Sequence, residues 1–481
     1  MTISRSQRGW ALALTSVAFF MVALDALVVI TALPSIHRDL GASLSTLEWT
    51  INAYTLAYAA GIITAAALGD RFGRRRVFAA GLALFTAASA ACALAPTAEL
   101  LIACRVIQGL GAAIIMPLSL TILTTAFPPQ RRGAIVGLWG GIGGLAVAGG
   151  PLVGGAITQG LDWHWIFWVN VPIGLVASVL ATVRLAESHG PATRLDLPAV
   201  GLVSGGAIGI VWGLVRASDV GWGSAQTLVT LALGLLLLVG FVAWERRAPE
   251  PMLPLRLFRS RAFAAANATG FLMVAALFGA VFLASQYFQL GLGFSPLGTG
   301  VRFLPWTATP MLVAPAAGVL SDRIGQRPVM VAGMLLQAVG LAWVALVATT
   351  GVAYGQMVLP LLVAGIGVSM AIATTPTAVL SAVAPPDMGK ASGANSTFQR
   401  FGSVFGVAVA TAVFAANGHL GTAASVNAGF RPALAVAADL SLLGALPALA
   451  VRSRRLATRT SSVPADSGVT TEASAMQHSA V

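Results

Sequence analysis

The sequence is poor in charged residues, and this shortage narrows the class of protein. Only 9% of its 481 residues are Asp, Glu, Lys or Arg, whereas about a quarter would be charged in a soluble protein of average composition. Hydrophobic residues make up 57% of the chain. These proportions exclude an ordinary water-soluble domain and indicate a protein that lies largely within a membrane.

Cysteine is also scarce, and several catalytic motifs are missing. The two cysteines, Cys92 and Cys104, lie inside long apolar runs and form neither a disulfide framework nor a metal-binding pattern. The sequence contains no Walker loop, no nucleophile elbow and no cluster of metal ligands. We therefore expect a protein that is not an enzyme and that requires no cofactor and no metal.

Long hydrophobic runs are the dominant feature that is present. Several runs of about 18 to 25 residues are each long enough to cross a bilayer as a helix, so the predicted fold class is an all-α polytopic membrane protein. We predict about 14 spans from the hydropathy pattern. Their bounds are 10–34, 47–69, 77–95, 98–121, 134–158, 165–184, 197–216, 225–244, 262–288, 298–320, 328–349, 356–380, 397–417 and 430–451.

The positive charge of the chain follows its predicted topology. The formal net charge is +12, but the arginines are scattered through short loops, so we do not expect nucleic-acid binding. Placing the N-terminus inside puts most of the Lys and Arg residues on the cytoplasmic side. The first run follows Arg5 and Arg8 but is too long for a signal peptide, so we predict an uncleaved first helix. We expect a multi-pass protein of the cell membrane with both termini cytoplasmic.

One short pattern occurs twice, each time between two long apolar runs. Residues 66–76 and 318–327 both read small-x-x-x-Asp-Arg-x-Gly-x-Arg. Glycine allows a tight turn, and the arginines hold that turn outside the bilayer. The residues that we expect to control conformational change are Asp70, Arg71, Gly73, Arg74, Asp322, Arg323 and Gly325. The alternative is a charged loop that only sets topology, although internal repeats are typical of transporters.

This repeated pattern resembles the signature loop of the major facilitator superfamily, with Ala66 in place of the usual Gly in the first copy. The resemblance implies two six-helix bundles, at 1–196 and 262–455, which alternately open to each side of the membrane. An extra helix pair with a cytoplasmic connector would occupy 197–261, as in the fourteen-helix drug:proton antiporter branch (multidrug efflux type). We expect residues 456–481 to form a disordered cytoplasmic tail.

The fourth span carries a charge within the membrane. Arg105 and Gln108 are three residues apart and share a helix face, and a charge in hydrocarbon is costly unless it is paired or hydrated. The segment Arg105–Gly111 resembles the family motif Arg-x-x-Gln-Gly-x-Gly, which implies a role for Arg105 in proton coupling. We expect Gln108 to line the substrate cavity. The alternative is that Arg105 extends to the outer surface.

The fifth span is rich in glycine from residue 137 to residue 155. This density permits close helix contacts and a bendable axis. The segment resembles the antiporter motif of the superfamily, which ends Gly-Pro-x-x-Gly-Gly, although Ala146 replaces one of its usual glycines. The residues that we assign to the motif are Gly137, Gly150, Pro151, Gly154 and Gly155. The alternative is ordinary helix packing.

Asp25 lies inside the first span, about nine residues or roughly 13 Å from its predicted outer end. Burial favours the neutral carboxyl, which suits reversible proton binding. Its segment resembles the first-helix motif of fourteen-helix drug exporters, with Leu27 and Ile30 replacing the usual Thr and Asn. We predict that Asp25 couples proton movement to transport. The alternative is a structural acid paired with a neighbouring helix.

Four further polar residues lie in or near the predicted spans. Asp439, in the last span, is interpreted either as a structural residue or as an auxiliary proton site. Gln286, Tyr287 and Gln289 end the ninth span and are predicted to line the substrate cavity at an outer gate. The alternative for these three is an interfacial belt.

The leading functional hypothesis is a proton-coupled antiporter that exports hydrophobic or cationic drugs by alternating access. The expected partners are a drug-like small molecule, protons and the lipid bilayer, and we expect a monomer. One alternative is an exporter dedicated to a single metabolite or antibiotic. A non-transporting membrane receptor or anchor is an alternative of another class. Such a protein would not need Asp25 and Arg105 inside the bilayer, which distinguishes it from a transporter.

Overall fold

The computed structural model describes residues 4–189, 196–221, 223–249, 251, 255–384 and 387–451. Within these ranges the chain is helical with short connections and has no strand. Eleven of the described helices are long and apolar enough to cross a membrane. The all-α polytopic fold is therefore confirmed. The predicted tail, residues 456–481, lies outside the described residues.

The helices follow the predicted spans closely. The first group consists of α1 (Arg5–Leu40), α2 (Leu44–Phe72), α3 (Arg74–Ala93), α4 (Ala98–Ala126), α5 (Pro129–Gly160), α6 (Trp165–Trp168) and α7 (Asn170–Arg184). A helix pair follows, α8 (Leu197–Val220) and α9 (Ala225–Glu245), and then the short 3-10 helix η1 (Leu255–Arg259). The last group is α10 (Arg261–Gln286) with its π-helical extension η2 (Tyr287–Gly291), α11 (Pro296–Thr307), α12 (Thr309–Ile324), α13 (Gln326–Val347), α14 (Gly355–Ser381), α15 (Met388–Asn417) and α16 (Ala423–Ala448).

Two predicted spans are each divided into two helices. The tenth span breaks at Ala308, between α11 and α12. Pro310 explains this break, because it has no N–H to donate and its ring disfavours helical geometry in the preceding residue. The sixth span breaks between α6 and α7, where Asn170 begins the second helix. Each pair continues as one span.

Three helices extend at least six residues beyond one of their predicted bounds. α1 runs to Leu40 rather than ending at residue 34, α15 begins at Met388 rather than 397, and α16 begins at Ala423 rather than 430. As a consequence, Arg400 and Arg431, which stand near the starts of their predicted spans, lie well inside α15 and α16. Asp25 is also farther from the end of α1, and Asp439 farther from the start of α16, than predicted.

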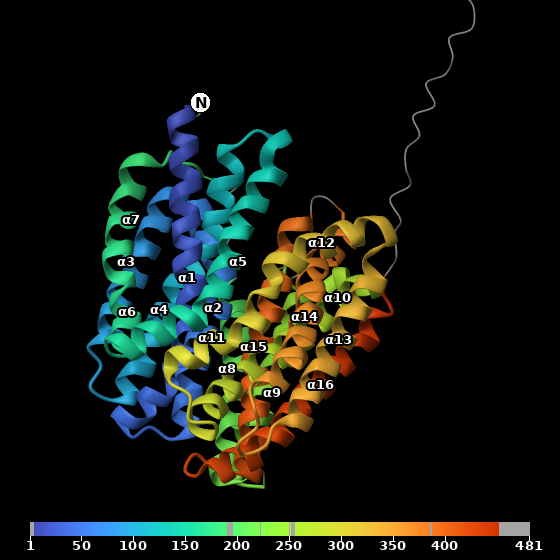
Figure 1. Cartoon of the computed structure of the whole chain (residues 1–481). Helices are drawn as coiled ribbons and strands as arrows, with labels where there is room; N and C mark the ends of the chain where they lie inside the picture. The colour runs from blue at the N-terminus through green and yellow to red at the C-terminus, as the bar shows by residue number, and fades with distance from the viewer. Residues whose placement is uncertain are drawn as a thin grey trace, which may run out of the picture.

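The helices pack as two bundles, α1–α7 and α10–α16, which lie side by side in Figure 1. The pair α8–α9 is not isolated from them. Ala207 and Val211 of α8 pack in one apolar cluster with Leu56 of α2 and Val404 of α15. Helix α8 therefore covers the line along which the two bundles meet.

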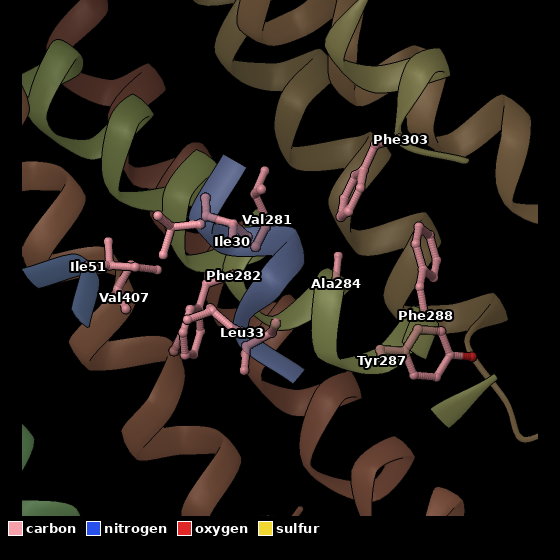
Figure 2. Close-up of a cluster of buried hydrophobic side chains, with 14 of the residues drawn as sticks. Ile30, Leu33, Ile51, Val281, Phe282, Ala284, Tyr287, Phe288, Phe303 and Val407 are labelled. Carbon is pink, nitrogen blue, oxygen red and sulfur yellow. The ribbon is translucent and has the colours of Figure 1, made fainter. Parts of the chain in front are cut away.

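The two bundles are in close contact toward one end of the molecule. We call the end with the loops after α2 and α12 the signature-loop end, and the other the opposite end. Near the opposite end, Ser285 Oγ of α10 donates to Ile30 O of α1 at 2.9 Å. Apolar side chains from both bundles, including Ile30, Leu33 and Phe282, form one core there (Figure 2). This core seals the opposite end.

Packing is sparser at the signature-loop end. Phe72 at the end of α2 and Leu320 in α12 are exposed. A Cβ atom built on Gly318, the first residue of the second signature copy, would have no neighbour within 4 Å among the described residues, so no other helix packs closely on this glycine. The bundles thus separate toward the signature-loop end, as the upper part of Figure 1 shows.

Candidate functional site

The centre of the first bundle contains a buried ion pair between Asp25 of α1 and Arg105 of α4. Arg105 Nη1 lies 2.5 Å from Asp25 Oδ2, and each side chain is only 1% exposed. Asp25 is deep inside α1, 20 residues after Arg5 at its start and 15 residues before Leu40 at its end. The two charges therefore compensate each other deep inside the membrane-spanning region.

Three neutral side chains complete the hydrogen bonding of this pair. Gln108 Nε2 donates to Asp25 Oδ1 at 2.9 Å, and Asn170 Nδ2 donates to the same oxygen at 3.0 Å. Gln108 also accepts from Arg105 Nη1 at 2.7 Å. Ser89 Oγ accepts from both amides and donates to Phe167 O. We call Gln108, Asn170 and Ser89 the amide frame, and it fixes the carboxylate in one orientation.

Arg105 is further held by α2. Its Nε donates to Thr50 O at 3.0 Å, and its guanidinium lies 4.1 Å from the centre of the Tyr54 ring. The guanidinium thus has a carboxylate, an amide oxygen, a backbone carbonyl and an aromatic face as partners.

The sequence analysis predicted only some of the residues in this cluster. The spacing of Arg105 and Gln108 on one helix face was correct, but Gln108 belongs to the ion-pair network rather than to the substrate cavity where it was predicted. Asn170 and Ser89 were missed. The sequence held one signal for Asn170, which is a polar residue that follows a run of aromatic residues inside an apolar span. The structure shows that this residue stands at the break between α6 and α7.

The two signature loops have the turn geometry that their glycines predict. Gly73 has φ +103° and Gly325 has φ +92°, and glycine adopts this region readily whereas other residues rarely do. Within the first loop, Arg74 pairs with Asp70 at 2.8 Å. Glu187, after α7, accepts from the Arg75 backbone N–H at 2.9 Å and ties this loop to the end of the bundle.

The remaining charges of the signature loops are less constrained. Arg71 lies 5.3 Å from the centre of the Phe72 ring. Asp322 and Arg323, in the second loop, are exposed. Their conformational role stays a prediction.

The glycine-rich helix α5 packs closely against its neighbours at the predicted motif. A Cβ on Gly150 would lie 2.7 Å from Leu27 Cβ, and one on Gly154 would lie 2.4 Å from Thr31 Oγ1 of α1. Gly155 and Pro151 instead contact α11 of the other bundle. Gly137 is in the same helix, but its surroundings lie outside the described residues.

Three of the remaining predicted site residues need correction or refinement. Tyr287 does not line a cavity: it stacks on Phe430 at 4.2 Å and donates to Thr349 O, inside the second bundle. Figure 2 shows it beside Phe288, on the side away from Ile30. Gln289 does lie between the bundles, where its Nε2 donates to Thr31 O at 2.8 Å. Gln286 is fully buried, and its amide has no hydrogen-bond partner.

Asp439 is not a buried acid as predicted. It is exposed on α16 and lines a groove of about 760 Å³ between α13 and α16, together with Arg431 and several alanines. The groove is on the outer side of the second bundle, away from Asp25. Asp439 therefore does not belong to the buried cluster.

Comparisons with known proteins agree with this architecture. The family model described as Major Facilitator Superfamily matches residues 15–407. The chain is 37% identical to the tetracenomycin C resistance and export protein of Streptomyces glaucescens over 84% of this chain and 75% of the relative. It is 34% identical to the puromycin resistance protein pur8 of Streptomyces alboniger over 92% and 90%. It is 35% identical to the multidrug resistance protein Stp of Mycobacterium tuberculosis over 84% and 75%.

Solved structures share the fold at low sequence identity. A crystal structure of the peptide transporter POT in complex with sulfate has a TM-score of 0.66 at 18% identity, covering 90% of this chain and 93% of that one. A bacterial homologue of the human lysosomal transporter Spinster, in an inward-facing and unoccupied conformation, has a TM-score of 0.65 at 15% identity, covering 93% and 97%. The chain is therefore a member of the Major Facilitator Superfamily, of the drug efflux type.

Proposed function

We propose that this protein is a proton-coupled antiporter that exports hydrophobic drug-like molecules across the cell membrane by alternating access. One observation carries the proposal: Asp25 and Arg105 form a 2.5 Å ion pair in the middle of the first bundle. Ionisable groups at this depth cost several kcal/mol and are retained for function by default. A receptor or anchor has no need of them.

The amide frame supports a two-state role for Asp25. When ionised, the carboxylate accepts hydrogen bonds from Arg105, Gln108 and Asn170. Protonation removes the charge that holds Arg105 in place, so the guanidinium then favours another arrangement. A change in that arrangement alters the contacts of α1, α2 and α4 together. This is how proton binding on one bundle biases its movement against the other.

The arrangement of the two bundles supports uptake of substrate from the signature-loop end. The bundles meet at the opposite end and separate toward the signature-loop end. The concentration of arginine in the loops of the signature-loop end favours a cytoplasmic location for that end and for both termini. In this orientation the protein loads substrate from the cytoplasm, exchanges it for a proton after the bundles rock, and releases it outside.

The printed names of the relatives support export of antibiotics or related drugs. They include proteins named for a single compound, such as tetracenomycin C, and proteins named for multidrug resistance. An exporter dedicated to one compound therefore remains the second candidate. Both candidates would couple transport to protons through Asp25, and they differ only in the range of substrates.

Dye efflux from cells that express the protein tests the proposal. Energised cells should keep a fluorescent substrate at a lower internal level than cells without the protein. A protonophore, which collapses the proton gradient, should abolish that difference within minutes. Efflux that continues at the same rate after the protonophore would exclude proton coupling, and no efflux of any compound in a broad panel would favour the receptor or anchor.

A further inference from the structure

Arg400 is a second arginine inside the membrane-spanning region, and the sequence did not assign it a function. It is the thirteenth residue of the 30-residue helix α15, so it lies more than three turns from the nearer end. Its side chain is half-buried. A charged group at this depth is expected to have a functional partner.

The contacts of Arg400 cross from one bundle to the other. Its guanidinium carbon lies 4.3 Å from the centre of the Tyr58 ring of α2, and its Nη2 lies 3.4 Å from the Tyr58 hydroxyl oxygen. Among the described residues, no carboxylate forms an ion pair with Arg400. The positive charge is therefore balanced only by an aromatic face and a neutral hydroxyl.

Tyr58 connects Arg400 to the buried ion pair. The rings of Tyr54 and Tyr58, one helical turn apart on α2, meet edge to face at 6.1 Å. Arg105 stacks on Tyr54 in the same way as Arg400 stacks on Tyr58. Of the two arginines on this tyrosine pair, only Arg105 has a carboxylate. Glu48, a buried acid of α2, is ten residues from Tyr58, about 15 Å along the helix.

Arg400 lies on the line where the two bundles meet, because its guanidinium reaches from α15 to Tyr58 of α2. Helix α8 covers the lipid side of the line between α2 and α15, where Ala207 and Val211 pack on Leu56 and Val404. Val404 is one turn from Arg400 toward the opposite end, so the guanidinium lies where the bundles begin to separate.

Polar groups extend from Arg400 toward the signature-loop end. Asn395 lies five residues earlier on α15, and Asn267 lies in the first half of α10. Both side chains are buried, and the amide oxygen of each has no hydrogen-bond partner within the described part of the chain. These two amide oxygens are hydrogen-bond acceptors in the second bundle, between Arg400 and the signature-loop end.

We propose that Arg400 anchors an anionic group of the transported molecule, so that the preferred substrates are hydrophobic acids rather than lipophilic cations. The inference rests on the proposed function and specifies its substrate class. A guanidinium binds a carboxylate or phenolate through two parallel hydrogen bonds, more strongly than it binds a neutral hydroxyl. An anion thus replaces Tyr58 as the partner of Arg400, whereas a cation is repelled.

Binding of two xanthene dyes with opposite charge tests this assignment. Fluorescein, an anion, and rhodamine 123, a cation, share a ring system, and their binding to the full-length protein in lipid nanodiscs is followed by fluorescence anisotropy. We expect the protein to bind fluorescein at least about tenfold more tightly than rhodamine 123. Arg400→Gln should remove at least about tenfold of the fluorescein affinity and leave rhodamine 123 binding unchanged or stronger. Arg400→Lys, which keeps the charge, should retain an intermediate affinity for fluorescein.

The matched control is Arg431→Gln. Arg431 is an exposed arginine of α16, and its Nε donates to Ala345 O on the far side of the second bundle. This variant should keep the preference for fluorescein. Equal binding of both dyes, a preference for rhodamine 123, or an unchanged preference in Arg400→Gln would each overturn the assignment. Because no proton gradient is present in this assay, its result is independent of the proton-driven efflux that tests the proposed function.

Discussion

Gly155 of α5 and Gly300 of α11 bring the two bundles into backbone contact near the opposite end. A Cβ atom on Gly155 would lie 2.3 Å from Pro296 O, and one on Gly300 would lie 2.4 Å from Pro151 O. Neither position therefore accommodates even an alanine without movement of the backbone. The glycines predicted to mark an antiporter helix thus include one that closes the contact between the bundles.

Replacing either glycine by alanine should shift the protein toward the state that is open at the opposite end. Overpacking of a close contact costs about 1–3 kcal/mol, which is enough to change the ratio of two states by about fivefold or more. Spin labels at the exposed residues Gly160 and His419 report the distance between the bundles at this end. We expect longer distances in Gly155→Ala and Gly300→Ala.

The control for this measurement is Gly149→Ala. Gly149 lies in the same helix as Gly155, but a Cβ there would have no neighbour within 4 Å. Its distance distribution should match that of the unmodified protein. If Gly155→Ala and Gly300→Ala also match it, the contact does not govern the conformational equilibrium.

The first signature loop should tolerate substitution poorly. Gly73→Val places a β-branched residue at φ +103° and brings its Cβ within about 3 Å of the Glu187 carboxylate. The cost is about 1–3 kcal/mol of local strain. Asp70→Asn removes the ion pair with Arg74. Both variants should reach the membrane in normal amounts but export dye more slowly, whereas Gly9→Val, at an uncrowded glycine, should not. If Gly73→Val and Asp70→Asn both exported dye at the normal rate, the loop would serve only to set the topology of the chain.

Cysteine labelling should define the orientation of the chain. Single cysteines introduced within residues 70–76 and 321–327 should react with an impermeant maleimide only after the membrane is opened. Cysteines within residues 35–46 should react in intact cells. Labelling of both signature loops from outside intact cells would reverse the proposed orientation and, with it, the direction of transport.

Much of the fold is predictable because the bilayer limits the length and composition of each helix. The predicted spans correspond to helices throughout the described residues, and the repeated Asp-Arg-x-Gly pattern lies at equivalent turns. Hydropathy failed at the start of α15, because residues 388–396 are small or polar and only the bundle interior makes them helical. Arg400, which stands near the start of the predicted span 397–417, therefore lies deeper in its helix than predicted.

The site was predictable only where one helix determines the geometry. Arg105 and Gln108 share a face because they are three residues apart on α4. The packing of α3 and α7 brings Asn170 to Asp25 and Ser89 to the amides of Gln108 and Asn170, and no local spacing encodes that packing. Tyr287 was misplaced for a related reason: it begins the π-helical segment η2, where the wider turn changes the direction of the side chains.

The amide frame should be needed for coupling as well as for stability. Gln108→Leu and Asn170→Leu each remove a hydrogen bond to Asp25 Oδ1. A hydrogen bond to a charged group contributes about 1.5–3 kcal/mol, so we expect proton-driven export to fall by about tenfold to 100-fold. The measurement is the initial rate of dye transport in everted vesicles. Asn417→Leu, at an exposed asparagine that bonds only within its own helix, should be neutral; equal rates in all three variants would contradict the role of the frame.

The most direct test of the account is uphill transport by Asp25→Asn in everted vesicles with an imposed pH gradient. Asparagine keeps the size and hydrogen bonding of the side chain but does not titrate, so Asp25→Asn should still bind substrate and yet fail to accumulate it. Asp25→Glu should retain partial activity. Asp439→Asn, run in parallel, should accumulate substrate normally, because Asp439 lies on the outer side of the second bundle. Accumulation by Asp25→Asn together with failure of Asp439→Asn would show that coupling belongs to the other acid.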